Sequence, residues 1–179
     1  LFRSFTTISH NNIRSIFEDH SGILWIGTYG GGLNRLNRKT GDFFNYKPNP
    51  QDRHSISHEN IISIYEDSNN NLWVGTDGGG LDQLNRELDQ FIHYKVSPND
   101  TNSISHNSIT NIYEDKTGIL WIGTSGGGIN TFDRQNKKFT RYTHDSGDNQ
   151  SLSTNITTAI LEDSAGILWF GWFGFNAGS

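Results

Sequence analysis

The sequence predicts an all-β protein assembled from copies of one four-stranded unit, and three observations lead to that prediction. One phrase recurs at a fixed step, since Glu18 to Thr28 returns 48 residues later as Glu66 to Thr76 and again as Glu114 to Thr124. Each copy consists of short apolar runs separated by Gly, Asn, Asp and Ser, which is typical of short strands. No segment shows a long helical apolar period, so no helix is required.

The step of 48 residues also separates the tryptophans Trp25, Trp73, Trp121 and Trp169. A fixed period of this size indicates one supersecondary unit that is copied and stacked. Short strands in sets of four are the pattern of a β-propeller blade, whereas a β-helix would need a far shorter repeat. We therefore predict β-propeller blades of four antiparallel strands in an incomplete propeller of about three and a half to four blades.

The four strands of the first unit follow from its residue pattern. A β-branched and aromatic run predicts a strand over 13–18, and a turn of polar residues and glycine follows it. The apolar run over 23–28 is continuous rather than alternating, so we expect burial on both faces between neighbouring blades. Three glycines lead into a strand over 32–37, and an aromatic-rich run marks the last strand over 42–47. The same strands are expected 48 and 96 residues later.

Proline and polar runs mark the connections between blades, and Pro48, Pro50 and Pro98 all lie in them. We predict a single partial propeller over 1–179, divided into strand d of a preceding blade at 1–6, blades at 7–47, 55–95 and 103–143, and a partial blade at 151–179. Because the chain starts at Leu1 and stops within a repeat, we expect a piece of a longer protein that forms an open arc. The alternative is a four-bladed ring in which residues 2–5 supply the outer strand of the last blade.

Composition argues against several classes of function. The formal net charge is −5, with 14 Lys and Arg mixed among 19 Asp and Glu, so there is no basic stripe for nucleic acid. Cysteine is absent, which excludes a disulfide framework and a thiolate metal site. No apolar run approaches the roughly 18 residues of a membrane span, so we expect no membrane contact by this segment. We predict neither a cofactor nor a metal.

The recurring phrase E-D-x-x-G-x-L-W-x-G-T-x-G-G-G-[LI], read at 18–33, 66–81 and 114–129, resembles the two-component regulator propeller repeat. The second copy has Asn70 in place of the first glycine, and the last copy departs from the pattern at 172–176. The resemblance implies the periplasmic or otherwise extracytoplasmic sensor region of a hybrid histidine kinase or a related signalling protein such as a diguanylate cyclase. It also implies oligosaccharides among the ligands.

Polar residues that recur in every copy are assigned to the fold. A catalytic carboxylate pair is needed once, whereas the pair Glu18 and Asp19 returns in each copy, so we predict that the Asp accepts backbone hydrogen bonds in its turn. The repeat tryptophans are predicted to be wedges between blades. His10, His58 and His106 recur before the first strand and are predicted to cap loops rather than to bind a metal.

Ligand-binding residues are expected where the copies differ. In an antiparallel blade the turns between the second and third strands lie on the same face as the connections between blades. Varying residues on that face are the predicted ligand-binding set: Tyr29, Asp77, Ser125, Arg53 and His54. An aromatic ring with charged and hydroxyl groups suits a small polar ligand such as an oligosaccharide. Variable loops can equally be surface that nothing constrains.

The leading functional hypothesis is a non-enzymatic ligand-sensing propeller fragment of a bacterial two-component regulator. The alternatives are a propeller enzyme, such as a glycan hydrolase or a lyase similar to streptogramin lyase, and an interaction scaffold without a ligand. His54 and Asp77 are the best catalytic candidates, but they form no recognisable catalytic set. The expected protein partners are the remaining blades of the parent protein or further copies of this chain.

Overall fold

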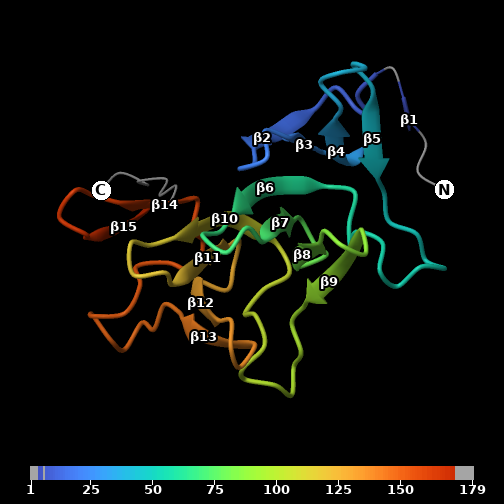
Figure 1. Ribbon diagram of the computed structural model, residues 1–179. Helices are drawn as coiled ribbons and strands as arrows, with labels where there is room; N and C mark the ends of the chain where they lie inside the picture. The colour runs from blue at the N-terminus through green and yellow to red at the C-terminus, as the bar shows by residue number, and fades with distance from the viewer. Residues whose placement is uncertain (1–3, 6, 172–179) are drawn as a thin grey trace.

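The computed structural model describes residues 4–5 and 7–171, which form antiparallel sheets joined by loops, with no helix in this part of the chain (Figure 1). The first sheet has the order β1-β5-β4-β3-β2 and contains β1 (Ser4–Phe5), β2 (Ile13–Glu18), β3 (Leu24–Thr28), β4 (Gly32–Leu36) and β5 (Phe43–Tyr46). The second contains β6 (Ile61–Glu66), β7 (Leu72–Thr76), β8 (Leu81–Asn85) and β9 (Gln90–Tyr94). The third contains β10 (Ile109–Glu114), β11 (Leu120–Thr124), β12 (Ile129–Asp133) and β13 (Lys138–Tyr142), and the fourth contains β14 (Ala159–Glu162) and β15 (Leu168–Gly171).

The sheets follow one another around an arc, with the first strand of each unit on the inside (Figure 1). The inner strands β2, β6, β10 and β14 contact one another in sequence, while β1, β9 and β13 lie at the outer edges of the first three sheets. This arrangement confirms the predicted all-β architecture of four-stranded propeller blades. In the first three sheets, each predicted strand begins and ends within one residue of the observed strand. Among the described residues, no helix is long and apolar enough to cross a membrane.

The N-terminal strand differs from the prediction. We expected residues 1–6 to form strand d of a preceding blade, but Ser4 and Phe5 pair with Phe44 and Phe43 of β5 and extend the first sheet. The outer edge of β5 otherwise presents unpaired backbone groups, and β1 hydrogen-bonds to them. Since β1 does not join β14 and β15, the described residues form an arc rather than the alternative ring. Residues 1–3 and 6, and the last part of the predicted partial blade at 172–179, lie outside the described residues.

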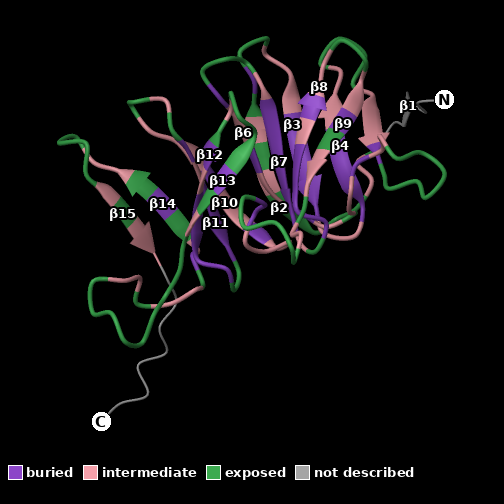
Figure 2. Cartoon of the chain, turned by 90° about the horizontal axis from the view of Figure 1, so that it is seen from below, coloured by how far each residue is buried: buried purple, intermediate pink, exposed green. Residues whose placement is uncertain are grey.

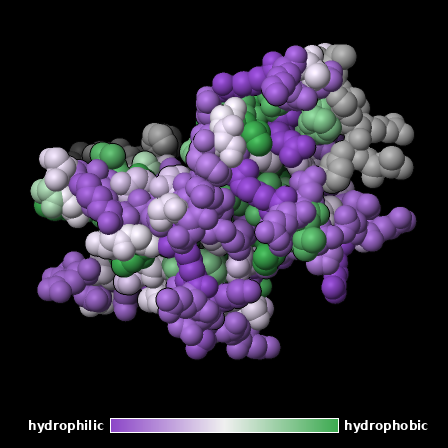
Figure 3. Space-filling view, in the orientation of Figure 1, coloured by the Kyte–Doolittle hydropathy of each residue, from purple (hydrophilic) through white to green (hydrophobic). Residues whose placement is uncertain are grey.

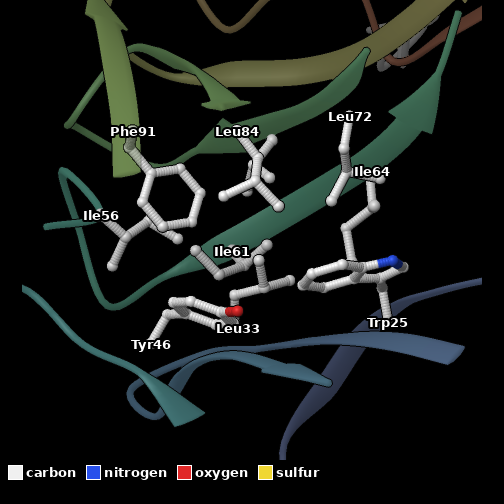
Figure 4. Close-up of a cluster of buried hydrophobic side chains, with 10 residues drawn as sticks. Trp25, Leu33, Tyr46, Ile56, Ile61, Ile64, Leu72, Leu84 and Phe91 are labelled. Atoms are coloured by element: carbon white, nitrogen blue, oxygen red, sulfur yellow. The ribbon is translucent and has the colours of Figure 1, made fainter. Parts of the chain in front are cut away.

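The hydrophobic core lies between adjacent sheets rather than within one of them. Figure 4 shows Trp25, Leu33 and Tyr46 of the first sheet facing side chains of the second, among them Leu84 and Phe91. An equivalent cluster between the second and third sheets contains Trp73, Leu81, Ile104, Ile109, Ile112, Leu120, Ile122, Phe132 and Phe139. Each fully buried side chain of this size contributes roughly 1.5–3 kcal/mol, so packing between blades is the main source of stability. On the surface, hydrophobic side chains show as small patches among hydrophilic ones (Figure 3).

Exposure of the repeat tryptophans measures how completely the next sheet covers each one. Trp25 and Trp73 are each 1% exposed, Trp121 is half-buried, and Trp169 is 59% exposed. Trp121, which packs against Phe170 of β15, is therefore less completely buried than Trp25 and Trp73. Figure 2 shows the same trend, with buried positions along β3 and β7 and mostly intermediate or exposed ones on β14 and β15. The gradient supports the predicted wedge role, since Trp25 and Trp73, which a complete following sheet covers, are the most buried.

Candidate functional site

The turns between the second and third strands of the first three sheets share one hydrogen-bonding arrangement. The buried Thr76 hydroxyl donates to the carbonyl oxygen of Gly80 at 2.8 Å, and the same bond joins Thr28 to Gly32 and Thr124 to Gly128. Gly80 has a φ of +89°, and an added Cβ would collide with the carbonyl oxygen of Tyr94. The residue that follows each threonine is thereby held in a defined place on the face. These residues are Tyr29, Asp77 and Ser125.

The recurring histidines support these turns. Nδ1 of His58 accepts a hydrogen bond from the backbone N–H of Asn60 at 3.0 Å, and the His58 ring lies against Gly78. His10 and His106 accept equivalent bonds from Asn12 and Ser108 at 3.1 and 3.0 Å. The predicted loop-capping role is confirmed by these contacts. Within the described ranges, no group of three or more His, Cys, Asp or Glu residues is arranged to hold a metal ion.

Two of the predicted ligand-binding residues meet in a polar chain that crosses three sheets. The Tyr29 hydroxyl donates to Oδ2 of Asp77 at 3.2 Å, and the Ser108 hydroxyl donates to Oδ1 of Asp77 at 2.6 Å. The guanidinium carbon of Arg14 lies 5.3 Å from the centre of the Tyr29 ring, a cation–π contact. Tyr29, Asp77 and Ser108 are half-buried, and Arg14 is exposed. We call these four residues the polar cluster.

The polar cluster offers several kinds of contact to a ligand. An ionised carboxylate has about four lone-pair sites, so Asp77 retains acceptor capacity beyond its two hydrogen bonds. Arg14 offers donors, and Tyr29 offers an aromatic surface. A few convergent polar groups beside an aromatic ring are typical of sites for small polar ligands.

Arg14 and Ser108 were missed by the sequence reasoning, although the same criterion of copy-to-copy variation would have found them. Arg14 corresponds to Ile62 and Thr110 in the next copies, and Ser108 corresponds to Asn60 and Ile156. Both positions lie at or near the start of an inner strand. Arg14 lies on β2, outside the turns and connections in which ligand-binding residues were expected.

Ser125 lies outside the polar cluster. Its turn forms an isolated backbone bridge with Ile156, whereas the equivalent bridge places Asp77 beside Ser108. Ile156 is 47% exposed and has no polar side chain to extend the chain of hydrogen bonds. Ser125 is exposed on the same face but does not share the contacts of Tyr29 and Asp77.

Arg53 and His54 lie at the outer rim, away from the other predicted residues. The His54 carbonyl oxygen accepts from the backbone N–H of Phe91 at 2.9 Å, and the Arg53 carbonyl oxygen lies 2.9 Å from Nε2 of His93. Both contacts are to the outer strand β9. A connection between blades runs from an outer to an inner strand, so its first half lies at the rim although it belongs to the predicted face.

Two surface hollows flank this rim connection. His54 lines a pocket of about 290 Å³ together with Tyr46 and Phe91, and Arg53 lines a hollow of about 570 Å³ with His93 and Lys95. The single site proposed from the sequence therefore separates into the polar cluster and the rim connection.

The opposite face carries a repeated ionic network around each tryptophan. Oδ2 of Asp67 accepts from the Trp73 indole N–H at 2.8 Å, while Oδ1 accepts the backbone N–H groups of Asn69 and Asn71. The predicted role of this Asp in its turn is confirmed. Arg134 of the next sheet donates to Asp67 at 3.1 Å and to Glu114 at 2.6 Å. The arginine thus joins the acidic residues of two adjacent sheets.

The equivalent network joins the first and second sheets, where Arg86 donates to Asp19 at 2.8 Å and to Glu66 at 2.6 Å. Arg38, Arg86 and Arg134 recur with the step of 48 residues, so repeat spacing alone could have identified the arginine. We call each of these sets an inter-blade clasp. One consists of Trp73, Asp67, Arg134 and Glu114, and the other of Trp25, Asp19, Arg86 and Glu66.

Electrostatics in the inter-blade clasp argues against general acid catalysis there. Burial alone would raise the pKa of Asp67, but hydrogen bonds from Trp73 and Asn71 and the charge of Arg134 together lower the pKa below 3.8. The pKa of Asp19 is likewise lowered, because its hydrogen bonds from Trp25, Ile23 and Arg86 outweigh the effect of burial. Both groups are ionised near neutral pH and have no proton to donate.

The fold and repeated clasp define a partial β-propeller made of closely similar blades. The sequence pattern of the family described as "Two component regulator propeller" matches residues 7–30, 55–78, 103–126 and 151–171, which together exceed half of the chain. The chain belongs to this family. No curated protein matches the chain.

Solved structures agree with the family assignment. The chain is similar to the extracellular domain of BT3049 from B. thetaiotaomicron, assigned as a hybrid two component system, with 28% identity and a TM-score of 0.80 over 91% of this chain and 22% of that one. The extracellular domain of BT4673 from the same organism, also assigned as a hybrid two component system, matches with 29% identity and a TM-score of 0.71 over 90% of this chain and 20% of that one. The chain thus spans about a fifth of these relatives.

Other propellers share the fold at lower identity. Virginiamycin B lyase from Staphylococcus aureus matches with 15% identity and a TM-score of 0.63, over 95% of this chain and 52% of the lyase. At this identity the likeness shows a common fold and does not transfer the lyase activity.

Proposed function

We propose that this chain is part of a non-enzymatic, extracytoplasmic sensor propeller of a two-component regulator, and that the polar cluster binds its ligand. The single observation that carries the ligand site is the Tyr29–Asp77–Ser108 chain, which joins three blades through side chains that differ between the copies. Family membership and the similarity to extracellular domains of two component systems support the signalling role.

A sensor role agrees better with the side-chain positions than an enzymatic role. The two catalytic candidates lie in different environments, because Asp77 bonds to Tyr29 and Ser108 while His54 lies beside β9. Nε2 of His54 accepts a hydrogen bond from Nε of Arg53 at 3.0 Å. A general base acts on a reacting group within hydrogen-bond reach, and this pair forms no shared centre.

The ligand class that best fits the polar cluster is a small, hydroxyl-rich molecule such as an oligosaccharide. Tyr29 supplies an apolar ring for stacking, although Arg14 covers part of it. Asp77 and Arg14 supply a charged acceptor and donor, whose hydrogen bonds are stronger than those between neutral groups. Binding between blades would bias their arrangement and so couple the ligand to a distant output domain.

We further propose that additional blades of the parent protein cover the open faces of this arc. On the first sheet, Ile13 and Ile16 are 45% and 62% exposed, whereas the equivalent Ile61 and Ile64 of the second sheet are 0% and 7% exposed. Arg38 already donates to Glu18 at 2.6 Å, as the arginines of the other clasps do to their own sheet. A preceding blade with its own Asp and Trp would complete that clasp.

Calorimetric titration of the parent protein with a panel of oligosaccharides tests the ligand site. Tyr29→Ala and Asp77→Ala should each weaken binding by at least tenfold, equivalent to about 1.4 kcal/mol. The matched control is Arg53→Ala at the rim, which should leave affinity unchanged. Undiminished affinity in both polar-cluster variants, or a loss confined to Arg53→Ala, would contradict the assignment.

A further inference from the structure

A buried carboxylate–imidazole pair lies in the second sheet outside the polar cluster. Nδ1 of His93, on β9, lies 2.6 Å from Oδ1 of Asp82, on β8. The Asp82 side chain is 0% exposed and that of His93 is 21% exposed. The other oxygen of Asp82 accepts the backbone N–H of Ser57 at 2.8 Å. Asp82 is therefore enclosed between its own sheet and the connection that leads into it.

The second ring nitrogen of His93 contacts the same connection. Nε2 lies 2.9 Å from the carbonyl oxygen of Arg53, in the segment 47–60 that joins β5 to β6. A carbonyl oxygen and a carboxylate oxygen both accept hydrogen bonds, so each ring nitrogen of His93 faces an acceptor. Both nitrogens can donate only when the imidazole is protonated. The geometry fits a charged imidazolium that ties the connection to the sheet.

The other copies show that this pair is particular to the second sheet. Asp82 is replaced by Asn34 in the first sheet and by Asn130 in the third, and both amides are fully buried. His93 is replaced by Asn45 and Arg141. The fold therefore accepts a neutral pair at these positions and does not require an ionisable one.

The third sheet offers a natural comparison, because Arg141 ties the connection ahead of that sheet. Its guanidinium donates to the carbonyl oxygens of Ser103 and Asp100 at 2.9 and 3.0 Å. An arginine keeps its charge across the accessible pH range, whereas a histidine titrates near neutrality. The connections before the second and third sheets are thus held at equivalent positions, one by His93, whose charge changes with pH, and the other by Arg141, whose charge does not.

We propose that His93 is a pH-sensitive tether, which holds the 47–60 connection on the second sheet when protonated and releases it when neutral. Neutral imidazole has one N–H and can satisfy only one of its two acceptors. The proton stays on the side of Asp82, since an enclosed carboxylate without a donor costs more than a carbonyl group that can turn to water. The hydrogen bond that is lost is the one to Arg53.

The groups around His93 determine the direction of the pH response. The hydrogen bond to Asp82 raises the pKa of His93, burial lowers it, and the Arg53 carbonyl raises it, while the charge of Lys95 lowers it. The net result is a pKa above the ordinary 6.5. The other ionisable side chains that approach on the connection are Asp52, Arg53 and His54.

Because the pKa of His93 is raised, the tether opens as pH rises. A group whose pKa is raised in the folded state stabilises that state fully below its unfolded pKa, here about 6.5. The stabilisation is lost as pH increases through the higher folded pKa of His93. A pH below about 6.5 therefore closes the tether, and a pH above the folded pKa of His93 opens it.

Release of the connection would also act on the polar cluster. The connection ends at Asn60, whose carbonyl oxygen accepts the backbone N–H of Asp77 at 2.9 Å and whose backbone bridges to Tyr29. Loosening this segment removes a support of the turn that presents Asp77. This effect on ligand binding rests on the proposed function, whereas the tether itself does not.

Hydrogen exchange on the unmodified chain between pH 5.5 and 9, corrected for intrinsic exchange rates, tests the tether directly. The informative amides are those of His54, Ser55 and Phe91, which bond within or to the connection. The matched amides at the third sheet are those of Asn102, Ser103 and Phe139. Protection of the first set should fall by up to about tenfold per pH unit above the pKa of His93, and the matched set should stay constant.

Substitutions that recreate the other copies sharpen the test. His93→Arg, which copies the third sheet, should keep the amides protected at all of these pH values. Asp82→Asn with His93→Asn, which copies the first sheet, should abolish the pH dependence. An NMR titration of His93 decides the proposal even where a variant fails to fold. A His93 pKa at or below 6.5, or equal loss of protection at both connections in the unmodified chain, would overturn it.

Discussion

The two faces of this arc differ in how they use the repeat. On one face each copy carries the same Trp and Asp, and the Arg and Glu of the next sheet complete an inter-blade clasp with them. On the other face the residue after the conserved turn threonine changes from Tyr29 to Asp77 to Ser125. Repetition marks contacts that every pair of blades needs, and variation marks contacts made once. Internal copies therefore serve as controls for one another.

The largest effect is expected from truncating a covered tryptophan. Trp73→Ala should reduce the free energy of unfolding by about 3–5 kcal/mol, because it removes a fully buried ring and leaves a cavity between blades. Chemical denaturation measures the loss. Trp169→Ala is the matched control at the same repeat position and should cost less than about 1 kcal/mol, since Trp169 is 59% exposed. Similar losses for both variants would refute the wedge role.

The inter-blade arginine is expected to have the next largest effect. Arg134→Ala should cost about 3 kcal/mol, because it leaves Asp67, whose side chain is 0% exposed, without its ionic partner. Arg38→Ala removes the same residue type from a pair whose side chains are 51% and 52% exposed, and should cost less than about 1 kcal/mol. Equal denaturation midpoints for the two variants would show that the bridge between sheets adds no stability.

Acid should weaken the clasp in a defined direction. The hydrogen-bonded Asp19 and Asp67 have pKa values below 3.8, so their contribution to stability is fully present above that pH and is lost as pH falls through the lower folded values. Thermal melts between pH 6 and 2 should show a decline that begins near pH 4. Asp67→Asn should show a shallower decline than the unmodified chain, and an unchanged pH profile would contradict the assignment.

The smallest expected effect is the loss of one hydroxyl in the polar cluster. Tyr29→Phe removes the hydrogen bond to Asp77 and should lower stability by about 1 kcal/mol or less, because Asp77 keeps its bond to Ser108 and access to water. Thermal denaturation of the variant measures this change. A loss above about 2 kcal/mol would mean that the cluster is a structural element rather than a ligand site.

The architecture could be predicted from the sequence because every blade carries the same sequence pattern. The Trp25 phrase and the glycine turns occur in register several times, so each strand was located from several copies at once. The N-terminal strand could not be placed in the same way, because Ser4 and Phe5 lie outside a complete copy and pair with the open edge of β5.

The candidate site was only partly predictable. The alternating direction of antiparallel strands correctly assigned Tyr29 and Asp77 to one face. It does not tell how far a residue on that face lies from the inner strands of the arc. Arg53 and His54 share that face and yet lie beside the outer strand β9. Contacts such as that of Arg14 with the Tyr29 ring depend on how two blades pack, which periodicity does not specify.

One face is expected to stabilise the fold and the other to bind the ligand, and one paired measurement on the parent protein tests this division most directly. Asp67→Asn and Asp77→Asn make the same chemical change on opposite faces, and each variant is followed by thermal denaturation and by calorimetric titration with the oligosaccharide that binds best. We expect Asp67→Asn to lower Tm by roughly 5–10 °C with unchanged affinity, and Asp77→Asn to weaken binding at least tenfold with Tm within about 3 °C. The reverse pattern, or parallel losses of stability and affinity in both variants, would contradict the division.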